Sequence, residues 1–128
     1  MEQKERRENP RVRICDPIAF LSVDSDGKAS HPNIAMVFDV SKTGIRIETF
    51  QPISSEDIIL MFFDLDQKQV EVRGAVIYCA QNDCGLYNVG INLAGTTSRN
   101  MDFVKALVKS YHYTKNTSHL PIIADLQN

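Results

Sequence analysis

Two short polar motifs carry most of the side chains that could do chemistry in this chain. The first is an arginine pair, Arg7 and Arg11, with Arg6 directly before it. The second has the pattern DxSxxG, runs from Asp39 to Gly44 and lies between two apolar stretches. Together they offer planar cations, a carboxylate, a hydroxyl and a permissive glycine. These are the groups needed to hold a guanine base and a phosphate diester at once.

The side chains of the two motifs suit this chemistry for separate reasons. An arginine fork donates two hydrogen bonds to a guanine edge or a phosphate, and its face stacks on a purine. Asp39 could accept from guanine N–H groups, and Ser41 could contact the ligand or brace the turn. Gly44 permits a conformation or close approach barred to other residues. Simpler interpretations are an Asx-type turn at Asp39 and Ser41, and a solvated basic arm.

The stretches around these motifs alternate between apolar and polar residues with the period of β-strands. In residues 44–50, for example, Ile45 and Ile47 share one face and Arg46 opposes them. The pattern predicts six strands, over residues 17–24, 33–39, 44–50, 58–63, 69–79 and 86–94. Gly90 lies inside the last, where glycine marks a bulge or a close approach. Short strands separated by turn residues indicate a small antiparallel barrel or sandwich.

A helical spacing follows the last strand. Apolar residues recur there at intervals of three and four: Met101, Val104, Leu107, Val108 and Tyr111. This spacing predicts one amphipathic helix over residues 98–112, packed on the strands and capped by Thr97 or Ser98. The tail from 114 to 128 contains the apolar stretch 120–123, which could be disordered or could dock on a partner.

One strand stretch does not alternate. Residues 58–63 read Ile-Ile-Leu-Met-Phe-Phe, so both faces of this strand need cover. One face would line the core. A helix of this chain or a second subunit would cover the other, and both alternatives stay open.

Cysteine and histidine usage gives no sign of a metal or catalytic centre. The odd number of cysteines, Cys15, Cys79 and Cys84, predicts reduced thiols. Cys79 and Cys84 flank an expected hairpin turn, so a disulfide between them is sterically conceivable. No second Cys or His pair completes a metal site, and no glycine-rich phosphate loop appears. An enzyme is therefore not expected.

The charge is spread unevenly. The formal net charge is -2, which argues against a general nucleic-acid binder. Residues 2–13 are nevertheless net positive and the remainder is acidic, which suits a small anionic ligand better than a long polyanion. No apolar run reaches membrane-spanning length and the N-terminus does not look like a signal peptide, so we expect a cytoplasmic protein without membrane insertion.

In this order and context the two motifs resemble the nucleotide-binding motifs of the PilZ domain, the bacterial receptor module for cyclic di-GMP. The family pattern is RxxxR, a strand, D/NxSxxG, further strands and a glycine in the last strand. It is matched here by Arg7, Arg11, Asp39, Ser41, Gly44 and Gly90. The resemblance covers roughly residues 6–112 and implies a mainly β fold, a six-stranded antiparallel β-barrel with a C-terminal α-helix. The implied division is a flexible basic arm over 1–13, the barrel and helix over 14–112, and a tail over 113–128.

Two details bear on how the ligand would be held. Many relatives have a second glycine just before the last residue of DxSxxG, where this chain has Thr43. Arg6 stands directly before the arginine pair. In the family, an arginine there tends to accompany an intercalated cyclic di-GMP dimer, which implies two ligand molecules per site. The alternative for Arg6 is a simple phosphate or solvent contact.

The resemblance implies a non-catalytic cyclic di-GMP effector. Its arm would fold over the ligand and change the surface offered to an unknown protein partner, with motility, biofilm or polysaccharide synthesis as possible outputs. A second hypothesis is a PilZ-fold adaptor that binds no nucleotide, which the retained motifs disfavour. A third is an OB-like single-strand-binding barrel, which the acidic body disfavours. Monomer and homodimer both stay open.

Overall fold

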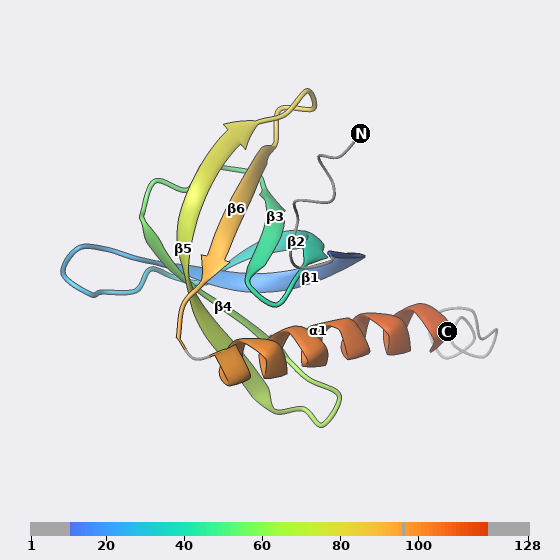
Figure 1. Ribbon diagram of the computed structural model, residues 1–128. Coiled ribbons are helices and arrows are strands. Elements are labelled where there is room, and N and C mark those ends of the chain that lie inside the picture. The colour runs from blue at the N-terminus through green and yellow to red at the C-terminus, as the bar shows by residue number, and fades with distance from the viewer. Residues whose placement is uncertain (1–10, 96, 118–128) are drawn as a thin grey trace, which may run out of the picture.

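Six antiparallel strands wind into a closed barrel, and one helix follows them (Figure 1). The computed structural model describes residues 11–95 and 97–117. The strands pair in the order β1-β2-β3-β6-β5-β4. The predicted six-stranded antiparallel barrel with a C-terminal helix is therefore confirmed, and the sandwich alternative is excluded. The elements are β1 Val12–Val23, β2 Asn33–Val40, β3 Gly44–Thr49, β4 Asp57–Phe63, β5 Gln69–Gln81, β6 Tyr87–Leu93 and α1 Thr97–Thr117.

Three of the turns between strands use the same local chemistry. Asp24, Asp64 and Asn82 each accept hydrogen bonds from the backbone N–H groups two and four residues later. Such Asx turns bend the chain locally without help from the core. The residue three positions on has a positive φ in every case: Gly27, Gln67 and Gly85. This chemistry sets the β4–β5 and β5–β6 hairpins and the turn that follows β1.

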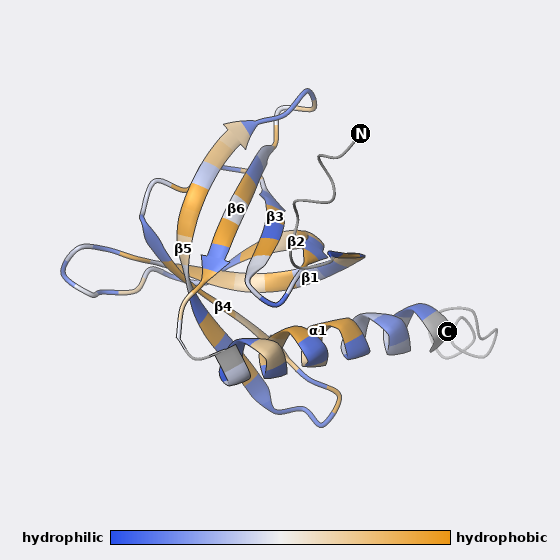
Figure 2. Ribbon diagram, viewed as in Figure 1, coloured by the Kyte–Doolittle hydropathy of each residue, from blue (hydrophilic) through white to orange (hydrophobic). Residues whose placement is uncertain are grey.

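The barrel interior is filled by the apolar residues of the alternating pattern. Val37, Ile47, Leu60 and Val89 are completely buried, and each lies on a different strand. Figure 2 shows hydrophobic and hydrophilic positions alternating along the strands. Because the period of a strand is two, the residues between these positions face outward. The barrel wall therefore offers a separate outer surface for binding.

Helix α1 covers one end of the barrel. Its residues Phe103 and Leu107 are buried in the core, and the Phe103 ring meets the edge of Phe62 with centroids 5.3 Å apart. In the apolar run of β4, Ile58 and Leu60 therefore line the core and Phe62 packs under the helix. The outward residues of the same run are only partly covered, and Phe63 is 63% exposed.

Two element ends differ from the prediction. Strand β1 begins at Val12 instead of residue 17, because Val12 and Arg13 pair with β2 and Pro17 lies inside the strand near a register shift. Helix α1 continues to Thr117 instead of ending at 112, since the chain from 113 to 117 contains no glycine or proline. Residues 12–13 of the expected arm thus belong to β1, and residues 113–117 of the expected tail belong to α1.

Candidate functional site

One row of side chains crosses the outer surface of five strands. The residues pair in sequence from strand to strand: Arg13 on β1, Asp39 on β2, Arg46 on β3, Gly90 on β6 and Tyr78 on β5. The strands carrying this row lie next to one another in Figure 1. The row thus brings together basic, acidic and aromatic side chains that lie far apart in the sequence.

Two β-bulges place Asp39 and Tyr78 in this row. By strict alternation Asp39 would share the inward face of Val37, but the register shifts between them and Asp39 lies opposite Arg46. A second shift between Val76 and Tyr78 likewise sets Tyr78 opposite Gly90. A bulge inserts one extra residue into a strand and so re-aims the side chain that follows. The placement of both side chains thus depends on irregular pairing.

Asp39 is the electrostatic centre of the row. Its Oδ1 lies 2.8 Å from Nη1 of Arg11, and its Oδ2 lies 2.8 Å from Nη2 of Arg46. The Asp39 side chain is 7% exposed, whereas the two arginine side chains are 35% and 40% exposed. A buried carboxylate needs such partners to offset the loss of water. Since two cations share one anion, the cluster retains positive charge toward solvent.

Arg46 makes one further contact besides its ion pair with Asp39. Its guanidinium carbon lies 5.6 Å from the centroid of the Phe38 ring, a cation–π contact. Its Nε is buried and makes no hydrogen bond to the described residues. The Arg46 side chain is therefore held by Asp39 and Phe38, while its buried Nε has no partner among the described residues.

Ser41 and Gly44 build the turn that follows Asp39. The Ser41 hydroxyl accepts hydrogen bonds from the backbone N–H groups of Thr43 and Gly44, at 3.3 and 3.1 Å. The Ser41 N–H donates to the Gly44 carbonyl at 2.8 Å. A Cβ at Gly44 would lie 3.1 Å from the Ile91 carbonyl oxygen and 3.9 Å from Arg11 Nη2. Ser41 thus braces the turn, and Gly44 lets the chain pass close to β6 and to Arg11.

Gly90 makes room for the aromatic ring at the other end of the row. A Cβ at Gly90 would stand 2.2 Å from Cε2 of Tyr78. The absence of that carbon lets the ring of Tyr78 lie against the β6 backbone. The tyrosine remains 46% exposed. The site therefore ends in an aromatic surface open to solvent.

Comparison with known proteins identifies the family of this chain. A family model described as the PilZ domain matches residues 5–110. The chain belongs to the PilZ domain family. A search of curated proteins found no match.

The PilZ fold is also seen in solved structures. The PilZ domain of Escherichia coli YcgR, solved with c-di-GMP, is 11% identical with a TM-score of 0.58, covering 88% of this chain and 96% of that one. Bacillus subtilis MotI/DgrA, an inhibitor of motility, is 11% identical with a TM-score of 0.58, covering 80% and 50%. The K. pneumonia MrkH–c-di-GMP complex is 14% identical with a TM-score of 0.57, covering 84% and 55%. The chain thus spans about half the length of MotI and MrkH.

Five of the seven predicted site residues lie in the part of this PilZ domain that the structure describes. Arg11, Asp39 and Gly44 meet at one end of the row, with Ser41 buried beneath them, and Gly90 lies two strands away. Arg6 and Arg7 lie outside the described residues. The expectations for these two arginines, and for the rest of the arm over 1–10, therefore remain predictions.

Sequence reasoning did not place three residues of the row among the site residues: Arg13, Arg46 and Tyr78. Arg46 was predicted to face outward from its strand, and its distance from the turn mirrors that of Asp39, so hairpin pairing could have found it. No local signal points to Tyr78, because its position depends on the bulge in β5 and on the non-local glycine opposite it.

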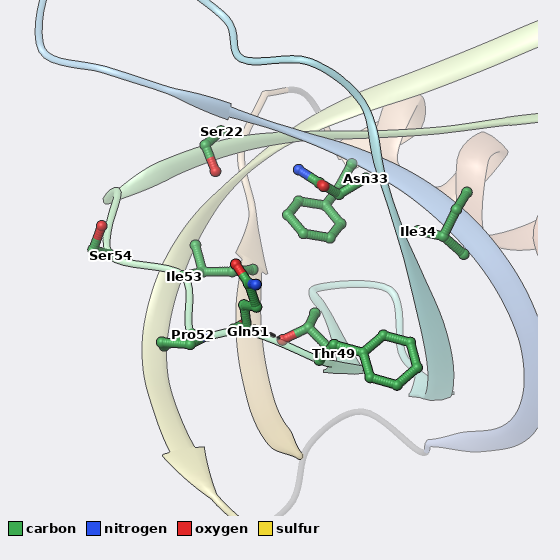
Figure 3. Close-up of a pocket in the computed structure, with 10 residues that line it drawn as sticks. Ser22, Asn33, Ile34, Thr49, Gln51, Pro52, Ile53 and Ser54 are labelled. Carbon is green, nitrogen blue, oxygen red and sulfur yellow. Dashed lines mark hydrogen bonds between the residues drawn. The ribbon is translucent and has the colours of Figure 1, made fainter. Parts of the chain in front are cut away.

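A separate pocket of about 390 Å³ lies away from the PilZ motifs (Figure 3). It is formed by the start of β2 and the segment after β3, and the Thr49 hydroxyl donates to the Gln51 carbonyl at 2.7 Å beside it. None of its lining residues is charged: Phe20, Ser22, Asn33, Ile34, Thr49, Phe50, Gln51, Pro52, Ile53 and Ser54. A phosphate diester would find no cation there, so the outer row is the better candidate site.

The remaining chemistry-bearing residues form no second centre within the described ranges. No group of three His, Cys, Asp or Glu side chains could hold a metal ion there. All three cysteines are free thiols. Cys79 lies opposite Val89, whereas Cys84 belongs to the turn, so the hairpin does not place them face to face. Over residues 11–95 and 97–117, no helix has the length and apolar character to span a bilayer.

Proposed function

We propose that this PilZ domain binds cyclic di-GMP on the outer row and has no catalytic role. The observation that carries the proposal is the Asp39 carboxylate held between Arg11 and Arg46, in one row with Tyr78. The arginines would grip guanine edges and phosphates. Asp39 would accept from guanine N–H groups, and Tyr78 would stack on a base. Structures of YcgR and MrkH with c-di-GMP support this ligand for a related fold.

The N-terminal arm would complete the site. Arg11 directly precedes β1 and already contacts Asp39, so the arm enters the described structure at the site itself. An extended chain spans at most about 3.5 Å per residue, which keeps Arg7 within reach of a ligand beside Arg11. Arg6 and Arg7 would then close over the ligand, and with Arg6 two intercalated molecules would be bound.

The N-terminal arm would transmit ligand binding to a downstream protein. Docking of residues 1–10 on the ligand would change the surface presented to a downstream protein in the cytoplasm. The alternative of a nucleotide-free adaptor predicts no heat with cyclic di-GMP. The retained motif residues Arg11, Asp39, Ser41 and Gly44 disfavour that alternative.

Isothermal titration with cyclic di-GMP tests the proposal, with GTP and cyclic di-AMP as controls. We expect selective binding and a stoichiometry of two ligands per chain. Absence of heat with cyclic di-GMP, together with no thermal shift, would overturn the receptor assignment. One ligand per chain would overturn only the role of Arg6.

Variants locate the binding. Arg11→Ala and Arg7→Ala should each weaken binding, since losing a bidentate arginine costs about 1–3 kcal/mol, or about 5-fold to about 150-fold in Kd. Arg73→Ala is the matched control, because Arg73 is exposed on β5 opposite Ile59 and outside the row. If Arg11→Ala and Arg73→Ala bound equally well, the ligand would not occupy this row.

A further inference from the structure

The middle of the outer face of β1 and β4 is apolar. Over residues 17–21 of β1 and 59–63 of β4, the side chains that alternation puts outward are all apolar: Pro17, Ala19, Leu21, Ile59, Met61 and Phe63. Asp57, the first residue of β4, is exposed beyond them on the same face and marks its charged edge. Leu21 pairs with Ile59 and Ala19 pairs with Met61, so the set forms a continuous surface. Outward sheet faces exposed to water normally alternate in a polar pattern. An apolar face of this extent indicates an interaction site.

The surface has a ridge and a groove side by side. Ile34 on β2 pairs with Ala19 and is 66% exposed, and Phe63 on β4 is 63% exposed. Between these larger side chains the smaller Pro17 and Ala19 form the floor of a groove of about 320 Å³. The groove is wide enough for an apolar side chain of the size of isoleucine.

The charges lie at the edges of this apolar face. Met61 pairs with Glu71 and Ile59 pairs with Arg73 on β5. On the other side, Met36 pairs with Glu48 of β3. The result is an apolar centre with a charged rim, the usual anatomy of a protein interface.

We propose that this face binds a second copy of the chain and forms a symmetric homodimer. A two-fold interface brings each surface against itself, so it needs self-complementary shape and no charge near the axis. The face meets both conditions. Ile34 of each copy would enter the groove floored by Ala19 of the other, and no like charges would meet in the centre. An acidic or basic partner would instead find no opposite charge there.

This interface would leave the ligand row free. The row crosses β1 at Arg13 and β2 at Asp39, whereas the apolar face uses Ala19 of β1 and Ile34 of β2. These residues lie six and five positions away along the same strands, or roughly 17–20 Å at the rise of a β-strand. Dimerisation therefore requires no ligand. The dimer and cyclic di-GMP binding can be tested, and can fail, independently.

Light scattering coupled to size-exclusion chromatography tests the dimer without nucleotide, over about 1–300 μM protein. We expect a mass rising toward twice 14.4 kDa with concentration. Ile34→Arg should raise the dimer dissociation constant at least tenfold. Ile77→Arg is the matched control, since Ile77 is 65% exposed against 66% for Ile34 but lies on β5, across the barrel from β2.

The outcomes are decisive in both directions. A monomeric mass throughout, or equal effects of Ile34→Arg and Ile77→Arg, would overturn the proposal. Circular dichroism checks that each variant folds. If Ile34→Arg did not fold, Met61→Lys would give the same test from the neighbouring strand, and a dimer unaffected by it would also overturn the proposal.

Discussion

At the scale of single residues, the Asp39 carboxylate is engaged before any ligand arrives. Arg11 and Arg46 each occupy one of its oxygens. Because the Asp39 side chain is only 7% exposed beneath these arginines, we expect a guanine edge to reach it by displacing one of them, and the displaced guanidinium would be free to bind a phosphate. Because Arg11 is continuous with the arm and Arg46 is fixed by Phe38, we expect Arg11 to be the one that moves.

Tyr78 gives the sharpest test of the aromatic end of the row. Tyr78→Ala should weaken cyclic di-GMP binding, because base–aromatic stacking contributes roughly 1–3 kcal/mol per base. Tyr78→Phe keeps the ring and should bind nearly as well as the parent protein. Titration calorimetry on the two variants separates stacking from a hydroxyl contact. A strong loss in Tyr78→Phe would show that the hydroxyl, not the ring, holds the ligand.

A pair of glycine substitutions separates binding from stability. In Gly90→Ala the new Cβ would collide with the exposed Tyr78 ring, which must swing away, so we expect weaker binding and little change in melting temperature. In Gly74→Ala the Cβ would stand 2.4 Å from Cγ2 of the core residue Ile91. Overpacking a core costs about 1–3 kcal/mol, so this variant should melt lower. Thermal melts and titrations of both variants provide the measurement. A lower melting temperature in Gly90→Ala with weaker binding in Gly74→Ala would contradict the assignment of Gly90 to the ligand site.

At the scale of elements, strand β1 carries a partly buried carboxyl group, that of Asp16. Burial raises the pKa of Asp16 above its usual value of 3.8. The folded state then holds this proton more tightly than the unfolded state, so the group favours folding below about pH 4. That contribution is lost as the pH rises through the raised pKa of the folded state, because the carboxyl group then ionises while it is partly buried.

Asp16→Asn should therefore melt at a higher temperature than the parent protein at pH 7. The difference should shrink as the pH falls toward 4, because the parent carboxyl becomes neutral as well. Calorimetric melts of both proteins across this range provide the measurement. A difference that stayed constant with pH would mean that packing, and not ionisation, distinguishes the two side chains.

The elements themselves were largely predictable. Alternation found all six strands, because one face of each is buried in a single core, and helical spacing found α1. The start of β1 was missed because Pro17 looks like a strand boundary, whereas the bulge between Arg13 and Asp16 accommodates the irregular pairing. The end of α1 was missed because no apolar residue marks its last turn. Order around the barrel, including the β1–β4 contact, has no local signature.

The candidate site was predictable to the extent that its residues are close in the chain. Ser41 and Gly44 belong to one turn, whose internal hydrogen bonds follow from their types, and Asp39 lies two residues before Ser41 at the end of β2. Tyr78 comes from a distant strand and depends on a bulge. Its relation to Gly90 is a fact of register, which side-chain periodicity does not encode.

At the scale of the whole molecule, ligand binding should be visible as stability. A ligand that binds only the folded state at about one hundred times its Kd adds about 2.7 kcal/mol. For a chain of this size that corresponds to a rise in melting temperature on the order of 10 °C. Differential scanning fluorimetry with cyclic di-GMP should show this rise and GTP should not. Equal shifts with both would indicate a non-selective anion site.

The closed barrel also determines how the chain reaches its folded state. Strands β2–β3, β4–β5 and β5–β6 are joined by short turns, but β1–β4 and β3–β6 join residues far apart in sequence. Ordering the intervening chain costs entropy before those pairs contribute stability. Folds dominated by such pairings refold in milliseconds to seconds. We therefore expect the hairpins to form early and the β1–β4 pairing to limit the refolding rate. Once that pairing has formed, every strand has two neighbours and no strand edge is left to pair with another chain.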